Sequence, residues 1–589
     1  MNADFKLSGL HAEARRPAAR MPASPAIRRT ATIAMTAALL LVAPVVRADE
    51  IGRTVAARRQ MVVCDSEPAA RVGLDVLQQG GNAVDAAVAT ALAMAVTFPE
   101  AGNLGGGGFM LVYPGQDREP ACIEYRETAP AAAAPDMFSL SDSKYGHKVV
   151  GVPGTVRGLE LAHRQYGKLP WKRLVEPAVR LAKEGFVIGA PLAESLNRLV
   201  AASPDFPELR RVFGKHEGRQ LWQAEDRLVQ NDLAHTLSLI AEQGPEAFYR
   251  GEIAEQLVAE MQSGGGLITA KDLAAYRANV RQAVHGTFRG YDIYGAPPPS
   301  SGGTAVIEAL NILENFDFDR EDHASARAMH LTIEAMRRAF CDRARHLGDP
   351  DFASVPTHLL DKAYARQLAQ EIDLERATPS ERLSPEIVLA GEGTDTTHFS
   401  IIDADGMAVA NTYTLEYSYG SRVVVRGAGF LLNNEMGDFN WKPGHTDRQG
   451  RIGTAANQIA PGKRMLSSQS PTIVVRNGRP VLITGSPGGR TIINTVICVL
   501  LNVLQYEMPL REAIDAPRLH HQWFPDQVRF EGLADKDFAE TLARLRARGH
   551  AIDPKSGRQG SANSIWVDPS SNRLHGAADT RRPGVAAGE

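Results

Sequence analysis

A predicted β-hairpin constrains the fold of this chain more than any other feature. Residues 396–414 contain two β-rich runs separated by Ala404-Asp405-Gly406, which is a strong hairpin signal. A two-residue turn would place Thr414 opposite Thr397. A three-residue loop with its glycine in the left-handed conformation would instead place Thr414 opposite Thr396. The turn type therefore decides which threonine faces Thr414.

Thr396 opens the first of these runs, within TDTTHFS at residues 394–400. If the chain is cut between Asp395 and Thr396, this threonine gains a free α-amine that can act as the base for its own hydroxyl. An α-amine with its usual pKa of about 8 suits that task near neutral pH. Such a nucleophile needs no histidine, so we expect Thr397 and His398 to alternate in a buried strand, where His398 orders the strand by hydrogen bonding.

Other strings accompany the hairpin in a fixed order along the chain. They are GGNAVDAA (80–87), GNLGGGGFM (102–110), YRETAP (125–130), PPPSSGG (297–303), TYTL (412–415), GFLLNNEMGDF (429–439), LSS (466–468) and GSPGG (485–489). With these strings the chain closely resembles the γ-glutamyltranspeptidase family. The resemblance covers essentially everything except the N-terminal leader.

The resemblance implies a fold and a maturation step. The fold is α+β, a four-layer αββα sandwich of the N-terminal nucleophile hydrolase type. Family members are made as one inactive chain that cuts itself, here between Asp395 and Thr396. The products would be a large subunit, 49–395, and a small catalytic subunit, 396–589, which together form one globule. Because the family threonine matched by Thr414 touches the nucleophile, we expect the three-residue loop.

Further elements follow from periodicity. Residues 83–96, with Asn82 as N-cap, and residues 326–340 have helical spacing. The runs 109–113, 409–413, 472–475 and 481–484 are predicted strands. Residues 200–270 are predicted to be largely helical, and 370–393 an exposed connector.

Ser486-Pro487-Gly488-Gly489 joins the last predicted strand to an apolar helix predicted over 492–504. Backbone amides at a helix N-terminus can stabilise a developing oxyanion. Taken alone, Pro-Gly-Gly between a strand and a helix is more typical of an ordinary turn. By resemblance, Gly488 and Gly489 are the oxyanion-hole glycines.

The resemblance also supplies a pocket for an amino-acid head group. Arg126, Ser467 and Ser468 match the family positions for the α-carboxylate, and a guanidinium fork suits that ligand. A buried ion pair of Arg126 with Glu124 or Glu127 is the alternative. Glu435 and Asp438 match positions for the α-ammonium.

Two positions depart from the family pattern. Glu416 stands where the family often has Asn, so one carboxyl is protonated, the donor differs in detail, or Glu416 turns away. Residues 441–463 correspond to a loop that lids the pocket in some bacterial members, but Gln449 stands near the place of its wall-forming Tyr. The sequence therefore does not decide whether a lid closes over the pocket, or whether water or an amine is the preferred acceptor.

The N-terminus reads as a signal peptide, residues 1–48, with Met21 a possible true start. Arg28 and Arg29 precede an apolar stretch, 34–46, that ends in Val46-Arg47-Ala48. An uncut anchor is the alternative. Cleavage would make the protein periplasmic or secreted, without a stable membrane span.

Composition limits the partners and the cofactors. A net charge of −3 without a basic stripe argues against nucleic-acid binding. The cysteines lack metal-type or redox-type spacing and read as buried apolar residues: Cys64, Cys122, Cys341 and Cys498. We expect no metal or organic cofactor.

The leading functional hypothesis is a γ-glutamyltransferase and glutathione hydrolase. Its partners are a small γ-glutamyl donor such as glutathione and an amino acid, dipeptide or water as acceptor. Alternatives are a glutaryl-type acylase, a relative acting on poly-γ-glutamate, or an uncut, non-catalytic scaffold.

Overall fold

The computed structural model describes residues 50–384, 396–442, 454–555 and 557–589. These belong to one compact unit, Ala48–Glu589. The predicted leader, Asp395 and Gln449 lie outside the described residues. In the described part of the chain, no helix combines the length and apolar character needed to cross a membrane.

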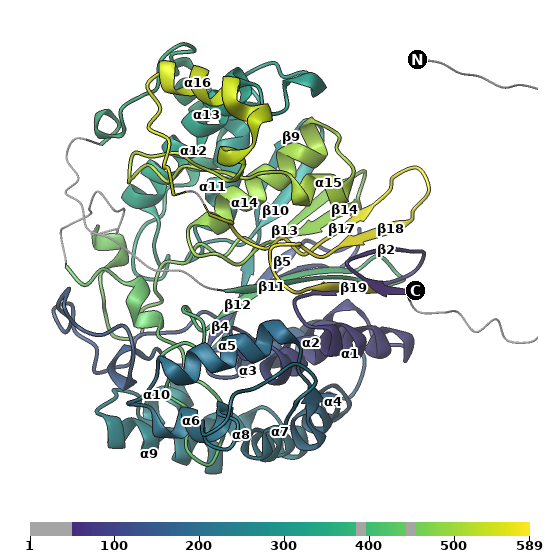
Figure 1. The fold of residues 1–589 in the computed structure, drawn as a ribbon, viewed down its shortest axis with the longest axis vertical. Helices are drawn as coiled ribbons and strands as arrows, with labels where there is room; N and C mark the ends of the chain where they lie inside the picture. Colours follow the sequence, from purple (N-terminus) through teal and green to yellow (C-terminus); the bar gives the residue numbers. More distant parts are fainter. Residues whose placement is uncertain (1–49, 385–395, 443–453, 556) are drawn as a thin grey trace, which may run out of the picture. The chain divides into compact units, whose positions relative to one another are not determined.

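Two antiparallel sheets form the middle of the unit, with helices on both outer sides (Figure 1). The eight-stranded sheet has the order β1 (Glu50–Gly52), β19 (Val585–Gly588), β3 (Met61–Cys64), β11 (Thr397–Ile402), β12 (Ala408–Thr414), β4 (Gly107–Tyr113), β5 (Ala121–Glu124), β8 (Asn279–Gln282). The seven-stranded sheet has the order β2 (Thr54–Ala57), β18 (Leu574–Ala577), β17 (Ser564–Val567), β14 (Arg479–Thr484), β13 (Thr472–Arg476), β10 (Tyr291–Gly295), β9 (Val284–Phe288). Two small ladders pair β6 (Phe186–Val187) with β7 (Arg227–Leu228) and β15 (Leu519–His520) with β16 (Arg529–Phe530).

The helices on the two outer sides come from different parts of the sequence (Figure 1). Those beside the eight-stranded sheet come from the first half: α1 (Glu67–Gln78), α2 (Ala83–Thr97), α3 (Thr155–Tyr166), α4 (Trp171–Glu184), α5 (Ala190–Ala201), α6 (Pro207–Phe213), α7 (Asn231–Gln243), α8 (Glu246–Tyr249), α9 (Glu252–Gly264), α10 (Ala270–Ala275). Those beside the seven-stranded sheet are α11 (Gly302–Leu313), α12 (Ala326–His346), α13 (Lys362–Gln370), α14 (Thr491–Leu500), α15 (Leu510–Asp515), α16 (Ala539–Ala547). The predicted αββα sandwich is confirmed.

Alternation along the strands builds a core between each pair of layers. In β3, Val62 and Cys64 belong to the cluster that includes the α2 side chains, whereas Met61 and Val63 belong to the cluster between the sheets. Successive strand residues point to opposite faces, so both faces of the central strands are buried. A third cluster joins the seven-stranded sheet to α11, α12 and α14.

Strands from before and after residue 395 alternate within the sheets. In the eight-stranded sheet, β19 lies between β1 and β3, and β11 and β12 lie between β3 and β4. In the other sheet, β18 pairs with β2, and β13 pairs with β10. A cut before Thr396 would therefore leave two chains that share both sheets.

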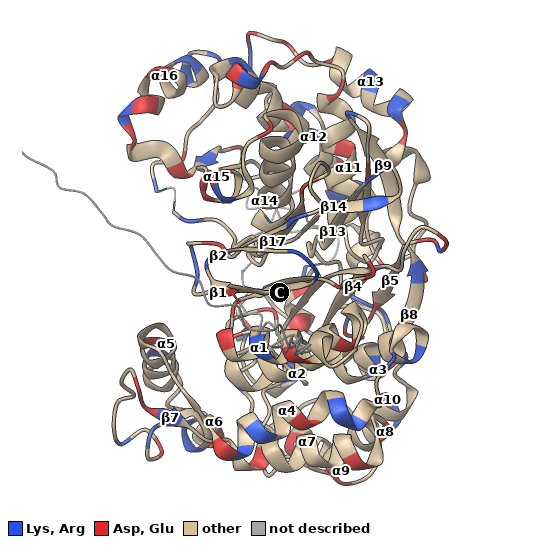
Figure 2. Ribbon diagram, turned by 90° about the vertical axis from the view of Figure 1, so that its right-hand side faces the viewer, with Lys and Arg blue, Asp and Glu red and all other residues tan. Residues whose placement is uncertain are grey.

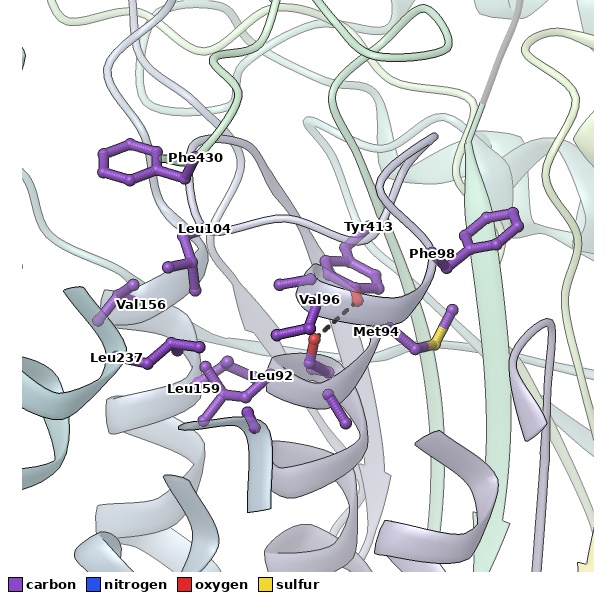
Figure 3. Packing of buried hydrophobic residues seen from close by; sticks show 14 of the residues in the cluster. Leu92, Met94, Val96, Phe98, Leu104, Val156, Leu159, Leu237, Tyr413 and Phe430 are labelled. Carbon is purple, nitrogen blue, oxygen red and sulfur yellow. Dashed lines mark hydrogen bonds between the residues drawn. The ribbon is translucent and has the colours of Figure 1, made fainter. Parts of the chain in front are cut away.

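Helix α2 packs within the buried cluster on the helical side of the eight-stranded sheet, where Leu92 and Val96 lie among side chains of other elements (Figure 3). All its residues are buried, and the Tyr413 hydroxyl donates to the Ala91 carbonyl at 3.0 Å. The predicted N-cap is confirmed: the Asn82 side chain accepts from the amides of Val84 and Asp85, and Asp85 accepts from the Asn82 amide. This reciprocal arrangement is a capping box.

The hairpin has the predicted three-residue loop. Thr397 pairs with Tyr413 and Ile402 with Ala408, so the same register places Thr396 opposite Thr414. At the turn, Gly406 has φ +86°, the left-handed conformation that the loop requires. The other predicted helices and strands are also present, with ends that differ by a few residues.

The predicted exposed connector is partly wrong. Its residues 385–393 lie outside the described part of the chain, but Ser380 and Ser384 are buried. The Ser380 hydroxyl donates to the Trp523 carbonyl at 2.6 Å, and its amide donates to Asp526 at 2.8 Å. Polar, Pro-containing sequence suggested solvent exposure, and most of the residues from 370 to 382 are exposed, but these long-range hydrogen bonds bury Ser380.

The sequence predicted four buried cysteines, and the structure confirms this for three of them. Basic and acidic residues alternate over the outer helices (Figure 2). All four cysteines are unpaired; Cys498 is partly exposed and the others are buried. Burial raises the pKa of the Cys64 thiol to about 12.

The capping box predicts the effect of Asn82→Ala. The change removes the acceptor for two amides and the donor to the Tyr166 carbonyl, at 2.6 Å. We expect the free energy of unfolding to fall by about 2 kcal/mol in urea titrations. Asn82→Ser keeps a capping oxygen and should lose less. Equal losses in both variants would contradict the capping role.

Candidate active site

One cavity brings together most of the residues that the sequence indicated. The space between the side chains is small, about 30 Å³. Predicted residues that line it are Arg126, Thr396, Thr414, Glu416, Glu435, Asp438, Ser467, Ser468 and Gly489. They come from segments spread over most of the described chain. Of the predicted site residues that the structure describes, only Gly488 is not in the lining.

Thr396 stands at the start of β11, where the hairpin register directs its hydroxyl to Thr414. The Thr396 Oγ1 donates to the Thr414 Oγ1 at 3.3 Å, and the Thr414 Oγ1 also accepts from the Glu416 amide at 2.8 Å. Both threonine side chains are almost fully buried. A hydroxyl held in this way has little rotational freedom, which favours reaction along one direction.

Residues distant in sequence hold the beginning of β11. The Thr397 Oγ1 donates to Asp65 at 2.9 Å, and the Asn563 side chain donates to the other Asp65 oxygen at 2.9 Å. The Arg582 guanidinium donates to the Thr396 carbonyl at 3.1 Å. Burial raises the pKa of Asp65 to about 6, although the charge of Arg582 opposes this shift.

His398 orders the strand, as expected, and does not line the cavity. The Ser400 hydroxyl donates to the Asn563 carbonyl at 2.8 Å, so its oxygen accepts from His398 Nε2, at 3.1 Å. His398 Nδ1 must then accept from the Thr412 hydroxyl, at 2.8 Å. Burial lowers the pKa of His398 to about 3, so the ring is neutral at pH 7.

The predicted strand–turn–helix is present after β14. Gly488 has φ +127° and Gly489 has φ +56°, and a Cβ at Gly488 would lie 2.5 Å from the Thr491 Oγ1. Helix α14 starts at Thr491, and the first amides of a helix have no acceptor within it. Since Gly489 lines the cavity with Thr396, this turn can supply oxyanion donors beside the hydroxyl.

Arg126 forms ion pairs with three carboxylates, of which the sequence predicted only Glu127. Its guanidinium contacts Glu435 at 2.7 Å, Glu127 at 3.4 Å, and Asp438. Glu124, the other predicted partner, instead pairs with Arg281 at 2.5 Å. The residues expected for an α-carboxylate and for an α-ammonium therefore contact each other directly.

This cluster is rich in acidic groups. Burial raises the pKa of Glu435 well above its usual range; Arg126 opposes the shift, and the neighbouring carboxylates add to it. Burial likewise raises the pKa of Glu127 to about 7. An arriving cation would favour the ionised carboxylates, so the cluster suits an ammonium group.

Glu416 lines the cavity and therefore does not turn away from it. Its Oε2 accepts from the Asn434 side chain at 2.5 Å. Its backbone has φ +80°, a region that Asn tolerates better than Glu. The departure from the family pattern thus adds an acidic side chain to the pocket at a conformation that costs backbone energy.

Six cavity residues were missed as site residues from the sequence: Arg343, Asn457, Leu466, Gln469, Arg490 and Ile492. Asn457 accepts from the Leu466 amide at 3.0 Å and donates to the Asp438 carbonyl at 2.9 Å. Arg343 lies three residues after Phe340 on the buried face of α12. The sequence offered one signal for Arg343: a charged residue stands at a helical position where the pattern expects an apolar side chain.

The described residues contain one cluster with metal-type side chains, away from the cavity: His330, Glu334 and His550. His330 Nδ1 lies 2.7 Å from His550 Nε2, and His330 Nε2 lies 2.8 Å from the Asp373 carbonyl. Glu334 pairs with Arg338 at 2.6 Å. These side chains are already hydrogen-bonded beside a guanidinium, which does not favour a bound cation.

The fold and site define the N-terminal nucleophile hydrolase class: two stacked antiparallel sheets between helices, with a hydroxyl residue opening a central strand beside a glycine turn. A family model described as Gamma-glutamyltranspeptidase matches residues 69–589. The glutathione hydrolase proenzyme of Escherichia coli (strain K12) is 46% identical over 543 residues, covering 90% of this chain and 92% of that protein. The chain therefore belongs to the gamma-glutamyltranspeptidase family.

Solved structures support the same assignment. A cephalosporin acylase from Bacillus halodurans is 29% identical with a TM-score of 0.80, covering 91% of this chain and 97% of that chain. The gamma-glutamyltranspeptidase of Helicobacter pylori is 39% identical with a TM-score of 0.53, covering 56% of this chain and 95% of that chain.

The buried, neutral His398 predicts a pH effect on stability. Because its pKa is about 3 when folded and about 6.5 in the unfolded chain, the unfolded state takes up a proton as pH falls between these values. Proton uptake by the unfolded state lowers the free energy of unfolding as pH falls. His398→Gln has no such group, so this contribution should be absent from the variant. Between pH 6 and pH 4, urea titrations should show a shallower decline for the variant, by up to about 1.4 kcal/mol per pH unit. Parallel curves would show that His398 is not buried neutral.

Proposed function

We propose that the protein is a γ-glutamyltransferase and glutathione hydrolase with Thr396 as nucleophile. The supporting observation is the position of the Thr396 hydroxyl between a glycine turn at a helix N-terminus and a buried pocket with both charge signs. Such a pocket suits an amino-acid head group, and the turn suits an amide carbonyl.

Maturation comes first in this proposal. The Thr396 hydroxyl attacks the Asp395 carbonyl carbon, the peptide C–N bond breaks, and the chain rearranges to an ester. Water hydrolyses the ester, which leaves the carboxylate of Asp395 on one subunit, 49–395, and the α-amine of Thr396 on the other, 396–589. The contacts of Thr396 with Thr414 and Arg582 support this role, because they orient its hydroxyl and carbonyl.

Turnover then uses the freed amine. It accepts the proton of the Thr396 hydroxyl as the oxygen attacks the γ-carbonyl of the donor. Amides of Gly488 and Gly489 stabilise the oxyanion, and the leaving amine takes the proton. An amino acid, a dipeptide or water next attacks the γ-glutamyl ester, which releases the product and restores the hydroxyl.

Donor recognition uses the charged groups of the cavity. We assign the α-carboxylate to Arg126, Ser467 and Ser468, and the α-ammonium to Glu416, Glu435 and Asp438. Binding must open the contacts of Arg126 with the carboxylates, because these groups already pair with each other and the whole cavity has a volume of only about 30 Å³. The head group would replace each broken ion pair with one of its own.

No step of this proposal uses a metal or an organic cofactor. We also propose that residues 1–48 are removed during export, which places the mature protein in the periplasm or outside the cell. Both subunits would come from one precursor.

A second candidate is a glutaryl-type acylase. The similarity to the cephalosporin acylase from Bacillus halodurans favours it. A glutaryl group has a carboxylate but lacks the ammonium, so it would leave Glu416, Glu435 and Asp438 without their partner. The acidic cluster therefore favours the γ-glutamyl donor.

The proposed nucleophile predicts the behaviour of Thr396→Ala. The variant should remain one uncut chain by intact mass and lose activity on a γ-glutamyl anilide by on the order of 10⁴-fold or more. Thr396→Ser keeps a hydroxyl and an α-amine, so it should still be cut and retain activity. Cleavage of the alanine variant at the same bond would exclude self-processing by Thr396.

The acidic cluster predicts donor preference. For the processed wild type, kcat/KM for a glutaryl anilide should be about 30-fold lower than for the γ-glutamyl anilide, because charged hydrogen bonds worth about 2 kcal/mol are missing. Amine release followed by absorbance gives both values. A higher value for the glutaryl compound would establish the acylase alternative.

A further inference from the structure

Arg343 is a buried guanidinium in the wall of the cavity, and the proposed mechanism does not yet use it. It lies near the end of α12 with 4% of its surface exposed. Its Nη2 donates to the Ser468 Oγ at 2.9 Å, and its Nε donates to the Ser301 Oγ at 2.7 Å. One rigid fork thus joins two serines from different segments.

The direction of these hydrogen bonds fixes the hydroxyl hydrogens. A guanidinium can only donate, so both serine oxygens accept from Arg343. The Ser301 hydroxyl then donates to the Ser467 carbonyl at 2.6 Å. The Ser468 hydroxyl hydrogen is left for an acceptor on another side, and Ser468 lines the cavity.

The PPPSSGG motif, residues 297–303, supports the adjacent serines Ser467 and Ser468 from the side opposite the cavity. Ser300 forms a parallel bridge with Ser467. The Ser467 amide donates to the Pro299 carbonyl at 2.9 Å, and the Ser301 amide donates to the Ser467 carbonyl at 2.8 Å. The Ser467 Oγ accepts from the Gln469 amide at 3.1 Å, which leaves its hydrogen available as well. Both serines therefore present donors, as an anionic ligand requires.

We propose that Arg343 is a positioning residue that makes Ser468 a fixed hydrogen-bond donor for the α-carboxylate of the donor substrate, with Ser301 holding the guanidinium in place. The inference rests on the proposed function. Arg126 is shared among three carboxylates, and Arg343 places a second guanidinium behind Ser468. The motif 297–303 thereby acquires a role in substrate specificity.

The test uses processed wild type and Arg343→Met with two anilides. One carries a γ-glutamyl group, and the other carries a 4-aminobutanoyl group, which lacks only the α-carboxylate. For the γ-glutamyl anilide, KM should rise about 10- to 100-fold with little change in kcat. For the 4-aminobutanoyl anilide, kcat/KM should stay within about 2-fold. Arg343→Lys keeps the charge without the planar fork and should recover only part of the loss.

A double-mutant cycle with Ser468→Ala separates positioning from a merely structural role. If Arg343 acts through Ser468, adding Arg343→Met to Ser468→Ala should raise KM little further. Additive increases, or equal losses for the two anilides, would overturn the inference. Self-cleavage and the thermal midpoint report folding; if Arg343→Met fails to fold, Ser301→Ala takes its place in the cycle, with the same criteria.

The outcomes also separate this inference from the function on which it rests. An active wild type with unchanged KM in the Arg343 variants rejects the inference alone. A wild type that is cut but inert toward the γ-glutamyl anilide rejects the proposed function, and the role of Arg343 falls with it.

Discussion

The site depends on the register of one antiparallel pair, β11 with β12. A shift of one residue would move Thr396 away from Thr414 and turn every side chain of β11 to the opposite face. Both strands are buried on both faces, so such a slip would also exchange the residues of two cores. The hydrophobic pattern and the left-handed Gly406 thus set the position of the Thr396 hydroxyl through the strand register alone.

Around that hairpin, the pocket holds more negative charge than a closed site can easily accommodate. Arg126 offsets the charge of Glu127, Glu435 and Asp438. Burial disfavours the ionised forms of Glu127 and Glu435. These ion pairs place both signs of charge in the wall of the cavity, which suits a ligand that also carries both. A neutral amide without a charged head group would open these contacts without replacing them.

Local signals in the sequence predicted the parts of the structure that depend on short-range interactions. The Asn82 capping box and the Gly406 loop each involve residues a few positions apart, and their side-chain chemistry is specific. The pocket assignments came from motif resemblance rather than from spacing. Asp65, Asn563 and Arg582 were missed, because they reach β11 from segments hundreds of residues away or from the end of the chain. Ser380 was misjudged for the same reason: its partners follow it by more than a hundred residues.

The alternation of strands from both halves has a consequence for the order of synthesis. β3 pairs with β11 on one side and with β19 on the other, and β19 ends at Gly588, one residue before the last. A nascent chain that has passed the hairpin still lacks β19, β17 and β18, as well as Asn563 and Arg582. The eight-stranded sheet can be completed only after β19 has left the ribosome. The hydrogen bonds of Asn563 and Arg582 around the start of β11 are therefore among the last to form, and the cleavage proposed before Thr396 would have to await them.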